Sequence, residues 1–362
     1  AYVSYYTENG LLGVSFPAGL KAKGQGTVGY VPKSYSLSLR GGYGQGSVTY
    51  PFFSDCAVST FYSLVLRNGG QDITMARMRD SFCSRIVNGL NLDYACTRPV
   101  ALYLNGEYWG LYDLNEELSA DYLVSHFGVK KSDVDFVKRN EWALKGSAKG
   151  YLNARSFARN ERLKSDSVFE EFAKMVDVDY CTDYIIAQTF IINSDMFNQK
   201  FWHTKDETVR WRPVFFDLDF GFQEASSAKR NLLPAYFSAE GIPSHDGSLT
   251  NLDVFVGLKK NEAWKTKFIE RYVELLCTKF SEEELLKVFD GMVEEMRPEM
   301  ERHIARWRSH GMSVKSVSDW NEHLDLMRRR VAARPAGALE NLQKYFHLSD
   351  SYIRDLVQKY SN

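Results

Sequence analysis

Residues 211–222 read WRPVFFDLDFGF, and the predicted fold and site both depend on this stretch. The run from Val214 to Phe220 is apolar apart from two acidic residues and predicts a strand that is central in its sheet. Asp217 and Asp219 lie two positions apart within it. Side chains at i and i+2 of a strand point to the same face, so we expect both carboxylates to project in one direction.

Two carboxylates placed in this way repel each other, and burial increases the cost unless a cation or several N–H donors neutralise them. Mg²⁺ and Mn²⁺ are hard cations that take carboxylate oxygens and leave positions open for substrate. The pair therefore predicts a divalent metal site that also binds nucleotide phosphates. Two alternatives remain open: a bulge that turns Asp219 outward, or a turn capped by both side chains.

A second polar segment lies upstream, where an apolar helix expected at about 179–193 ends. It contains Asn193, Ser194, Asp195 and Asn198. On its own such a segment is typical of a turn. Because it is only one hairpin upstream of the Asp pair, we expect the two segments to meet where the strands end, and to deliver a base and an amide to one site.

The first part of the chain predicts an antiparallel sheet. Short alternating apolar runs are separated by glycine-rich turns, and Asn105-Gly106 provides the two positive φ angles of a type I′ hairpin turn. One amphipathic helix is expected at about 75–90, behind an N-cap at Asp72 or Thr74.

Gly24 and Gly26 lie between two of these strands, and Lys33 opens the next one. Such a loop either lets the backbone approach phosphate, with the lysine as a point cation, or is only a turn with a solvated lysine.

Beyond Glu116 the pattern becomes mainly helical. We expect helices at about 117–127, 167–178, 179–193, 262–279, 281–308, 317–333, 335–345 and 348–360. Residues 145–166 are expected as a polar connection, and residues 224–252 as a long loop. The fold class is therefore α+β, with a β-rich N-terminal lobe over 1–116 and a mainly helical C-terminal lobe over 117–362 that contains a small β insert.

Charge and cysteine content limit the possible partners. Lys plus Arg number 45 against 46 Asp plus Glu, so overall charge gives no reason to expect nucleic acid or an anionic membrane as a partner. No apolar run approaches the ~20 residues that span a bilayer. The five cysteines show no zinc-ligand spacing and predict mostly buried thiols, although one pair could bridge in an oxidising compartment.

Several blocks in a fixed order carry a resemblance to a known family. They are Lys33-Ser34-Tyr35-Ser36-Leu37, Tyr43-Gly44, Tyr50-Pro51-Phe52-Phe53, residues 66–72, Arg79-Asp80, residues 104–112 with Glu116, Asn193-Ser194-Asp195 and residues 211–222. Together they resemble the CotH family of spore-coat-type atypical protein kinases. The match continues more weakly through Arg271, Arg306-Trp307 and Arg334-Pro335.

The resemblance implies a distant protein-kinase-like fold with two lobes, which hold ATP and Mg²⁺ or Mn²⁺ between them. The implied reaction transfers the γ-phosphate to Ser or Thr of a protein substrate. Lys33 would contact the α- and β-phosphates, and Gly24 and Gly26 would lie in the loop over them. Glu116 would line the nucleotide pocket or brace the cleft. An extracytoplasmic location, on the cell surface or secreted, is also implied.

In the second lobe the resemblance implies that Asp195 is the catalytic carboxylate that orients the hydroxyl. Asn198 would be a second metal or phosphate ligand. Asp217 and Asp219 would hold the metal, and either could be the principal ligand.

The sequence also departs from the family pattern. Met196 stands where the family often has Trp, Lys23-Gly24-Gln25 replaces a common Arg-Gly-Asn, and the predicted helix offers Asp80 instead of a Glu as partner for Lys33. These differences support a second hypothesis, a catalytically inactive kinase-like surface protein that binds glycan or protein partners. Asn68, Arg79 and Asp80 could equally form a structural hydrogen-bond cluster.

Overall fold

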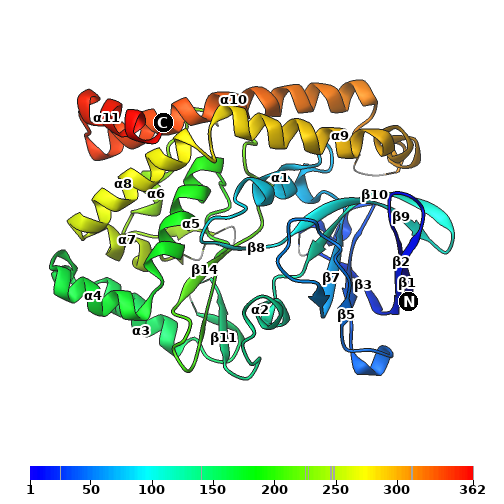
Figure 1. Cartoon of the computed structure of the whole chain (residues 1–362), viewed down its shortest axis with the longest axis horizontal. Coiled ribbons are helices and arrows are strands. Elements are labelled where there is room, and N and C mark those ends of the chain that lie inside the picture. The colour runs from blue at the N-terminus through cyan, green and yellow to red at the C-terminus, as the bar shows by residue number, and fades with distance from the viewer. Residues whose placement is uncertain are drawn as a thin grey trace. The chain divides into compact units, whose positions relative to one another are not determined.

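The computed structural model describes residues 1–24, 26–139, 141–224, 226, 228–244, 247, 249–310 and 313–361. Gln25, expected in the glycine-rich loop, and part of the stretch 224–252 lie outside the described residues. Helices and strands are mixed along the chain, which confirms the predicted combination of α and β structure (Figure 1).

The strands are β1 (Tyr2–Tyr6), β2 (Leu12–Pro17), β3 (Gly19–Lys23), β4 (Ser34–Ser38), β5 (Val48–Thr49), β6 (Thr60–Phe61), β7 (Ser63–Arg67), β8 (Asp93–Tyr94), β9 (Thr97–Leu104), β10 (Glu107–Glu116), β11 (Val134–Lys138), β12 (Trp142–Lys145), β13 (Lys200–Thr204), β14 (Arg212–Phe215), β15 (Ile242–Pro243) and β16 (Leu249–Thr250). The α-helices are α1 (Arg79–Ile86), α2 (Ala120–Phe127), α3 (Lys149–Ala158), α4 (Asp166–Met175), α5 (Val178–Ile191), α6 (Leu233–Tyr236), α7 (Asp253–Lys259), α8 (Glu262–Cys277), α9 (Glu282–Trp307), α10 (Val317–Phe346) and α11 (Asp350–Tyr360).

The chain forms two compact units that are interleaved in sequence. Unit 1 comprises Ala1–Arg85, Tyr94–Lys131 and Asp290–Asp325, and unit 2 comprises Ile86–Asp93, Ser132–Phe289 and Leu326–Asn362. The predicted lobes had a single boundary after residue 116. The two units differ from the predicted lobes mainly in residues 117–131 and 290–325, which were expected in the C-terminal lobe and belong to unit 1.

Unit 1 is built on a five-stranded sheet of order β3-β4-β7-β10-β9, antiparallel throughout. Its apolar side chains form a core with Phe16, Phe52 and Leu64 among the most buried. The β9–β10 hairpin turns at Asn105 (φ 52°) and Gly106 (φ 81°), so the predicted turn with two positive φ angles is confirmed.

The helix expected at about 75–90 is shorter in the structure, because α1 covers only Arg79–Ile86. Asp72 nevertheless caps it: one carboxylate oxygen accepts the backbone N–H groups of Met78 at 2.8 Å and Arg79 at 3.0 Å. The same carboxylate pairs with the Arg79 guanidinium at 3.1 Å. Asp72 was therefore a correct choice of capping residue, but it acts from outside the N-cap position.

The C-terminal end of α9 packs on β10 within unit 1. The Leu111 N–H donates to His303 Nδ1 at 3.1 Å, and Trp307 Nε1 donates to the Trp109 carbonyl at 2.7 Å. Gly110 lies between these contacts with φ 138°, and a Cβ there would come within 2.9 Å of His303 Nδ1. Glycine is needed here because the helix comes so close to the strand.

Unit 2 contains a second five-stranded sheet, of order β12-β11-β13-β14-β8, and most of the helices predicted for the second half of the chain. Three predictions were wrong. The connection 145–166 contains α3, and the described part of the expected loop 224–252 contains α6 and the paired strands β15 and β16. The two helices expected at 317–333 and 335–345 are one helix, α10, with Pro335 inside it. Strands β11 and β12 were not predicted. None of the described helices is both long and apolar enough to cross a bilayer.

Candidate active site

The two acidic residues after β14 do not continue the strand. β14 ends at Phe215, and Asp217 has φ 61°, in the left-handed region that Asp and Asn tolerate better than other non-glycine residues. The prediction that strand alternation orients both carboxylates was therefore wrong. Asp217 is half-buried, whereas Asp219 is only 1% exposed, so the alternative in which Asp219 turns outward does not hold either.

The loop after α5 meets this segment as predicted. Asn193 Nδ2 donates to the Asp217 carbonyl at 3.2 Å, and the Asn198 side-chain amide donates to an Asp217 carboxylate oxygen. Asn193 Oδ1 also accepts the backbone N–H of Asp195 at 3.2 Å. Asn193 therefore links the backbone of one acidic residue to the backbone of the other, and Asn198 holds the side chain of Asp217.

Sequence reasoning missed Lys138, the last residue of β11. Burial lowers the pKa of its ammonium, as does neighbouring Arg139, while the carboxylates of Asp217 and Asp195 act in the opposite direction. Lys138 is therefore a cation close enough to both acidic residues to interact with them electrostatically. No motif in the sequence indicated it, because it belongs to a strand that was not predicted.

The oxygen atoms of this cluster are suitable for a hard cation. Asn198 Oδ1 is buried and has no hydrogen-bond partner among the described residues. An oxygen in this state is costly in a buried site, and an added ligand would satisfy it. Amide and carboxylate oxygens, as in Asn198 and Asp217, are the ligand type that Mg²⁺ and Mn²⁺ prefer. The chemistry of these two side chains therefore suits the predicted divalent metal, and a role of Asp219 as a further ligand stays a prediction.

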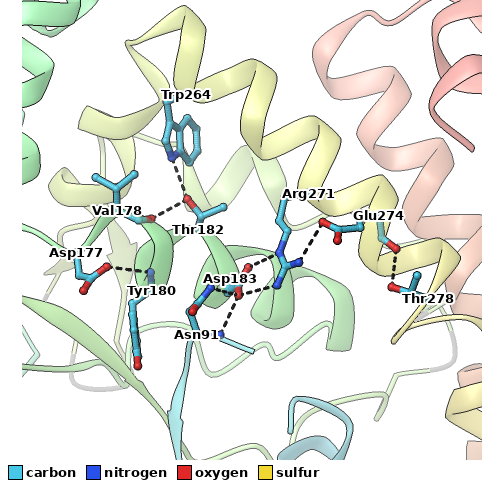
Figure 2. A network of polar contacts seen from close by, with 10 residues as sticks. All are labelled: Asn91, Asp177, Val178, Tyr180, Thr182, Asp183, Trp264, Arg271, Glu274 and Thr278. Carbon is cyan, nitrogen blue, oxygen red and sulfur yellow. Dashed lines mark hydrogen bonds and ion pairs between the residues drawn. The ribbon is translucent and has the colours of Figure 1, made fainter. Parts of the chain in front are cut away.

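Helix α5, which leads into this loop, is anchored near its N-terminal half by a network of polar contacts (Figure 2). Asp183 is 1% exposed and receives a two-pronged contact from Arg271, at 3.0 and 3.1 Å, and hydrogen bonds from the Asn91 backbone and side chain at 2.9 and 3.0 Å. Thr182 accepts from Trp264 Nε1 at 3.0 Å. These contacts tie α5 to α8 and to the chain before β8.

The C-terminal end of α5 is held by Arg334 of α10. This guanidinium is 1% exposed and donates to the carbonyls of Thr189 at 2.8 Å and Phe190 at 2.7 Å. It also donates to the carbonyls of Ala228 and Arg230, at 3.2 and 3.1 Å. A cation at the carbonyl end of a helix is favourable for the helix dipole. Arg334 therefore fixes the point at which the site loop leaves α5.

The remaining predicted residues lie in unit 1. Gly24 has φ 133°, and Gly24 and Gly26 lie in the loop between β3 and β4, as predicted. Lys33 directly precedes β4, and its Nζ donates to the Val28 carbonyl at 2.8 Å, so the lysine folds back over this loop. Asn68 holds the same turn by accepting from Ser34 Oγ at 2.8 Å.

Two other acidic residues of unit 1 have identifiable partners. Asp80 lies 3.5 Å from Arg67, and Asn68 and Arg79 make their own contacts, which supports structural roles for these residues. Glu116 accepts the backbone N–H of Cys96 at 2.9 Å and lies 2.7 Å from His126 Nε2. Its role beside a nucleotide stays a prediction.

Comparison with known families identifies the class of protein to which this site belongs. A family model described as CotH kinase protein matches residues 20–337 of the chain. A search of curated proteins finds no match. The matched range includes every predicted site residue from Gly24 to Asp219, in both units.

Proposed function

Because the chain belongs to the CotH kinase family, we propose that it is a metal-dependent protein kinase that transfers the ATP γ-phosphate to Ser or Thr of a protein substrate. The observation that carries the proposal is that Asn193 and Asn198 bring Asp195 and Asp217 together after α5, while the Asn198 amide oxygen is buried and has no hydrogen-bond partner within the described ranges. A kinase-like two-lobed fold is part of the same proposal.

In this proposal Asp217, Asp219 and Asn198 hold Mg²⁺ or Mn²⁺, which would neutralise charge on the phosphates when bound. Asn198 orients the Asp217 carboxylate through its amide N–H. Its amide oxygen, which has no hydrogen-bond partner in the described part of the chain, would then be the atom that binds the cation. Lys138 balances part of the negative charge of Asp217 and Asp195.

Asp195 is proposed to accept a hydrogen bond from the substrate hydroxyl and to orient it for attack. Its backbone N–H is fixed by Asn193, which also binds the Asp217 backbone, so the two acidic residues are positioned by one side chain. Lys33 is proposed to bind the α- and β-phosphates, under the backbone of the loop that contains Gly24 and Gly26. Positioning and electrostatics of this kind are most of what phosphoryl transfer requires from a protein.

Thermal unfolding with ATP plus Mn²⁺, compared with metal alone, tests nucleotide binding. A ligand at ~100 times its Kd adds ~2.7 kcal/mol to the stability of the folded protein. We expect Asp217→Asn to lose this stabilisation, and Asp355→Asn, an exposed carboxylate on α11, to keep it. Asp195→Asn should keep the stabilisation and lose about 10²- to 10⁴-fold in transfer of labelled phosphate to protein.

Two results would refute the proposal. One is wild-type stabilisation by oligosaccharides but not by ATP with metal, which would instead favour an inactive binding protein. The other is undiminished transfer by both Asp217→Asn and Asp195→Asn.

A further inference from the structure

Three potential metal ligands converge in unit 1. One sulfur each from Cys56 and Cys96 and a carboxylate oxygen of Glu116 all lie within 4.8 Å of one another. They come from three segments: the loop between β5 and β6, the residue before β9, and the last residue of β10. Cys96 and Glu116 are buried, and Cys56 is half-buried.

A fourth side chain contacts this cluster. His126 of α2 places Nε2 2.7 Å from one Glu116 carboxylate oxygen, and the Cys96 N–H donates to the other at 2.9 Å. The His126 ring stacks on Tyr122, with ring centroids 4.1 Å apart. Both oxygens of Glu116 are thus oriented, and the imidazole that orients one of them is itself held by packing.

The donor set indicates which ion would bind. Two thiolates and a carboxylate would place three negative charges in a mostly buried space, which is costly without a cation. Thiolate with nitrogen or oxygen donors is the set that binds Zn²⁺, whereas Mg²⁺ and Ca²⁺ prefer oxygen alone. At zinc bond lengths of about 2.3 Å to sulfur and 2.0–2.2 Å to oxygen, tetrahedral ligands lie about 3.5–3.8 Å apart. Side-chain adjustments of about 1 Å would bring these three atoms to that spacing.

We propose that Cys56, Cys96 and Glu116 bind a zinc-like divalent cation, with His126 as the residue that positions Glu116. Such a hydrogen-bonded outer partner is usual for metal ligands. Three protein ligands leave the fourth position of a tetrahedral ion for a water or another small ligand. Glu116 also borders a small pocket together with Phe61, Ser63, Tyr122 and Ser125.

A disulfide between Cys56 and Cys96 is the competing explanation. It would account for the closeness of the two sulfurs but not for the carboxylate and imidazole beside them. No local sequence pattern indicates this cluster, because Cys56 and Cys96 are separated by about forty positions that include strand β7 and helix α1.

Cobalt substitution tests the proposal on the whole chain. The protein is reduced, stripped with a chelator and titrated with Co²⁺ without oxygen. We expect one equivalent to produce the thiolate-to-cobalt charge-transfer absorption and the visible bands of tetrahedral Co²⁺, and Zn²⁺ to displace it. Cys56→Ser and Cys96→Ser should lose the charge-transfer absorption in whole or in part, while Cys277→Ser, a half-buried cysteine of unit 2, should leave it unchanged.

His126→Gln separates positioning from ligation. It should keep the absorption spectrum and weaken Zn²⁺ binding by about 10- to 100-fold. Unchanged affinity in this variant would remove His126 from the proposal.

A measurement on the wild type avoids any variant that fails to fold. Zn²⁺ should protect Cys56 and Cys96 from alkylation, as read by mass spectrometry, and should leave Cys277 as reactive as before. Folded, reduced protein that shows no cobalt absorption and no such protection would overturn the proposal. Recovery of Cys56 and Cys96 only as a disulfide would overturn it as well. Metal binding is the readout, so the result does not depend on kinase activity.

Discussion

Arg334→Met tests whether the site loop depends on the end of α5. The guanidinium donates to four carbonyls and is 1% exposed, and methionine has a similar length without donors. Hydrogen bonds from a charged group contribute about 1.5–3 kcal/mol each, which for four bonds would sum to about 6–12 kcal/mol. In the wild type, burial of this cation costs several kcal/mol, which offsets part of that sum. Arg334→Met is therefore expected to lower the free energy of unfolding by about 3–5 kcal/mol.

Urea unfolding measures this loss, and Arg329→Met is the matched control. Arg329 lies on the same helix but is exposed, so its replacement should change stability by less than about 0.5 kcal/mol. Because Arg334 also fixes where the chain leaves α5, Arg334→Met should weaken stabilisation by ATP with Mn²⁺, even at temperatures where the variant is fully folded. Equal unfolding free energies for the two variants would refute the assigned role of Arg334.

Three further predictions concern stability. Gly110→Ala should lose about 1–3 kcal/mol, because the new methyl group meets His303 and the backbone has φ 138°, while Gly42→Ala, where the added carbon meets open space, should change little. Burial and a neighbouring arginine, Arg77, hold the pKa of His303 well below its usual value. As the pH falls, the imidazole is therefore protonated in the unfolded state before it is protonated in the folded state. Stability should therefore be intact above about pH 6.5 and fall by up to about 1.4 kcal/mol per unit as pH drops below it, and His303→Gln should reduce that slope. Asp183→Asn should cost about 2 kcal/mol, because it replaces a charged pair with Arg271 by a neutral contact.

Each of these three stability predictions can be contradicted by one result. Equal melting temperatures for the two glycine variants would mean that the helix does not restrict the strand at Gly110. An unchanged pH slope in His303→Gln would assign the acid sensitivity to other groups. Wild-type stability in Asp183→Asn would mean that the network in Figure 2 does not anchor α5.

The sequence was informative where a local pattern determines the structure. Asn105-Gly106 predicted its turn, because two positive φ angles leave few other residue choices. The meeting of the loop after α5 with the acidic segment was also predictable, because only one hairpin separates them in the chain. Long amphipathic helices such as α8 and α9 were found close to their true bounds for the same reason.

Other features depend on contacts between distant segments, and no local pattern contains them. Lys138 lies on a strand whose short, mixed sequence gave no clear period. Arg334 stood out in the sequence only as part of the weaker family match, yet it is buried against carbonyls that lie more than a hundred positions earlier in the chain. The cluster around Cys96 unites a loop, a strand end and a helix that only the folded sheet brings together.

The acidic segment shows why alternation alone could not define the site. Strand geometry would have oriented Asp217 and Asp219 identically and given them the same environment. The left-handed backbone at Asp217 instead leaves its carboxylate half-exposed and held by Asn198, while Asp219 is buried. Because the two carboxylates differ in exposure, this local turn places Asp217 and Asp219 in different environments. Asp217→Asn and Asp219→Asn are therefore expected to differ, with the first losing metal-dependent nucleotide binding and the second also losing stability.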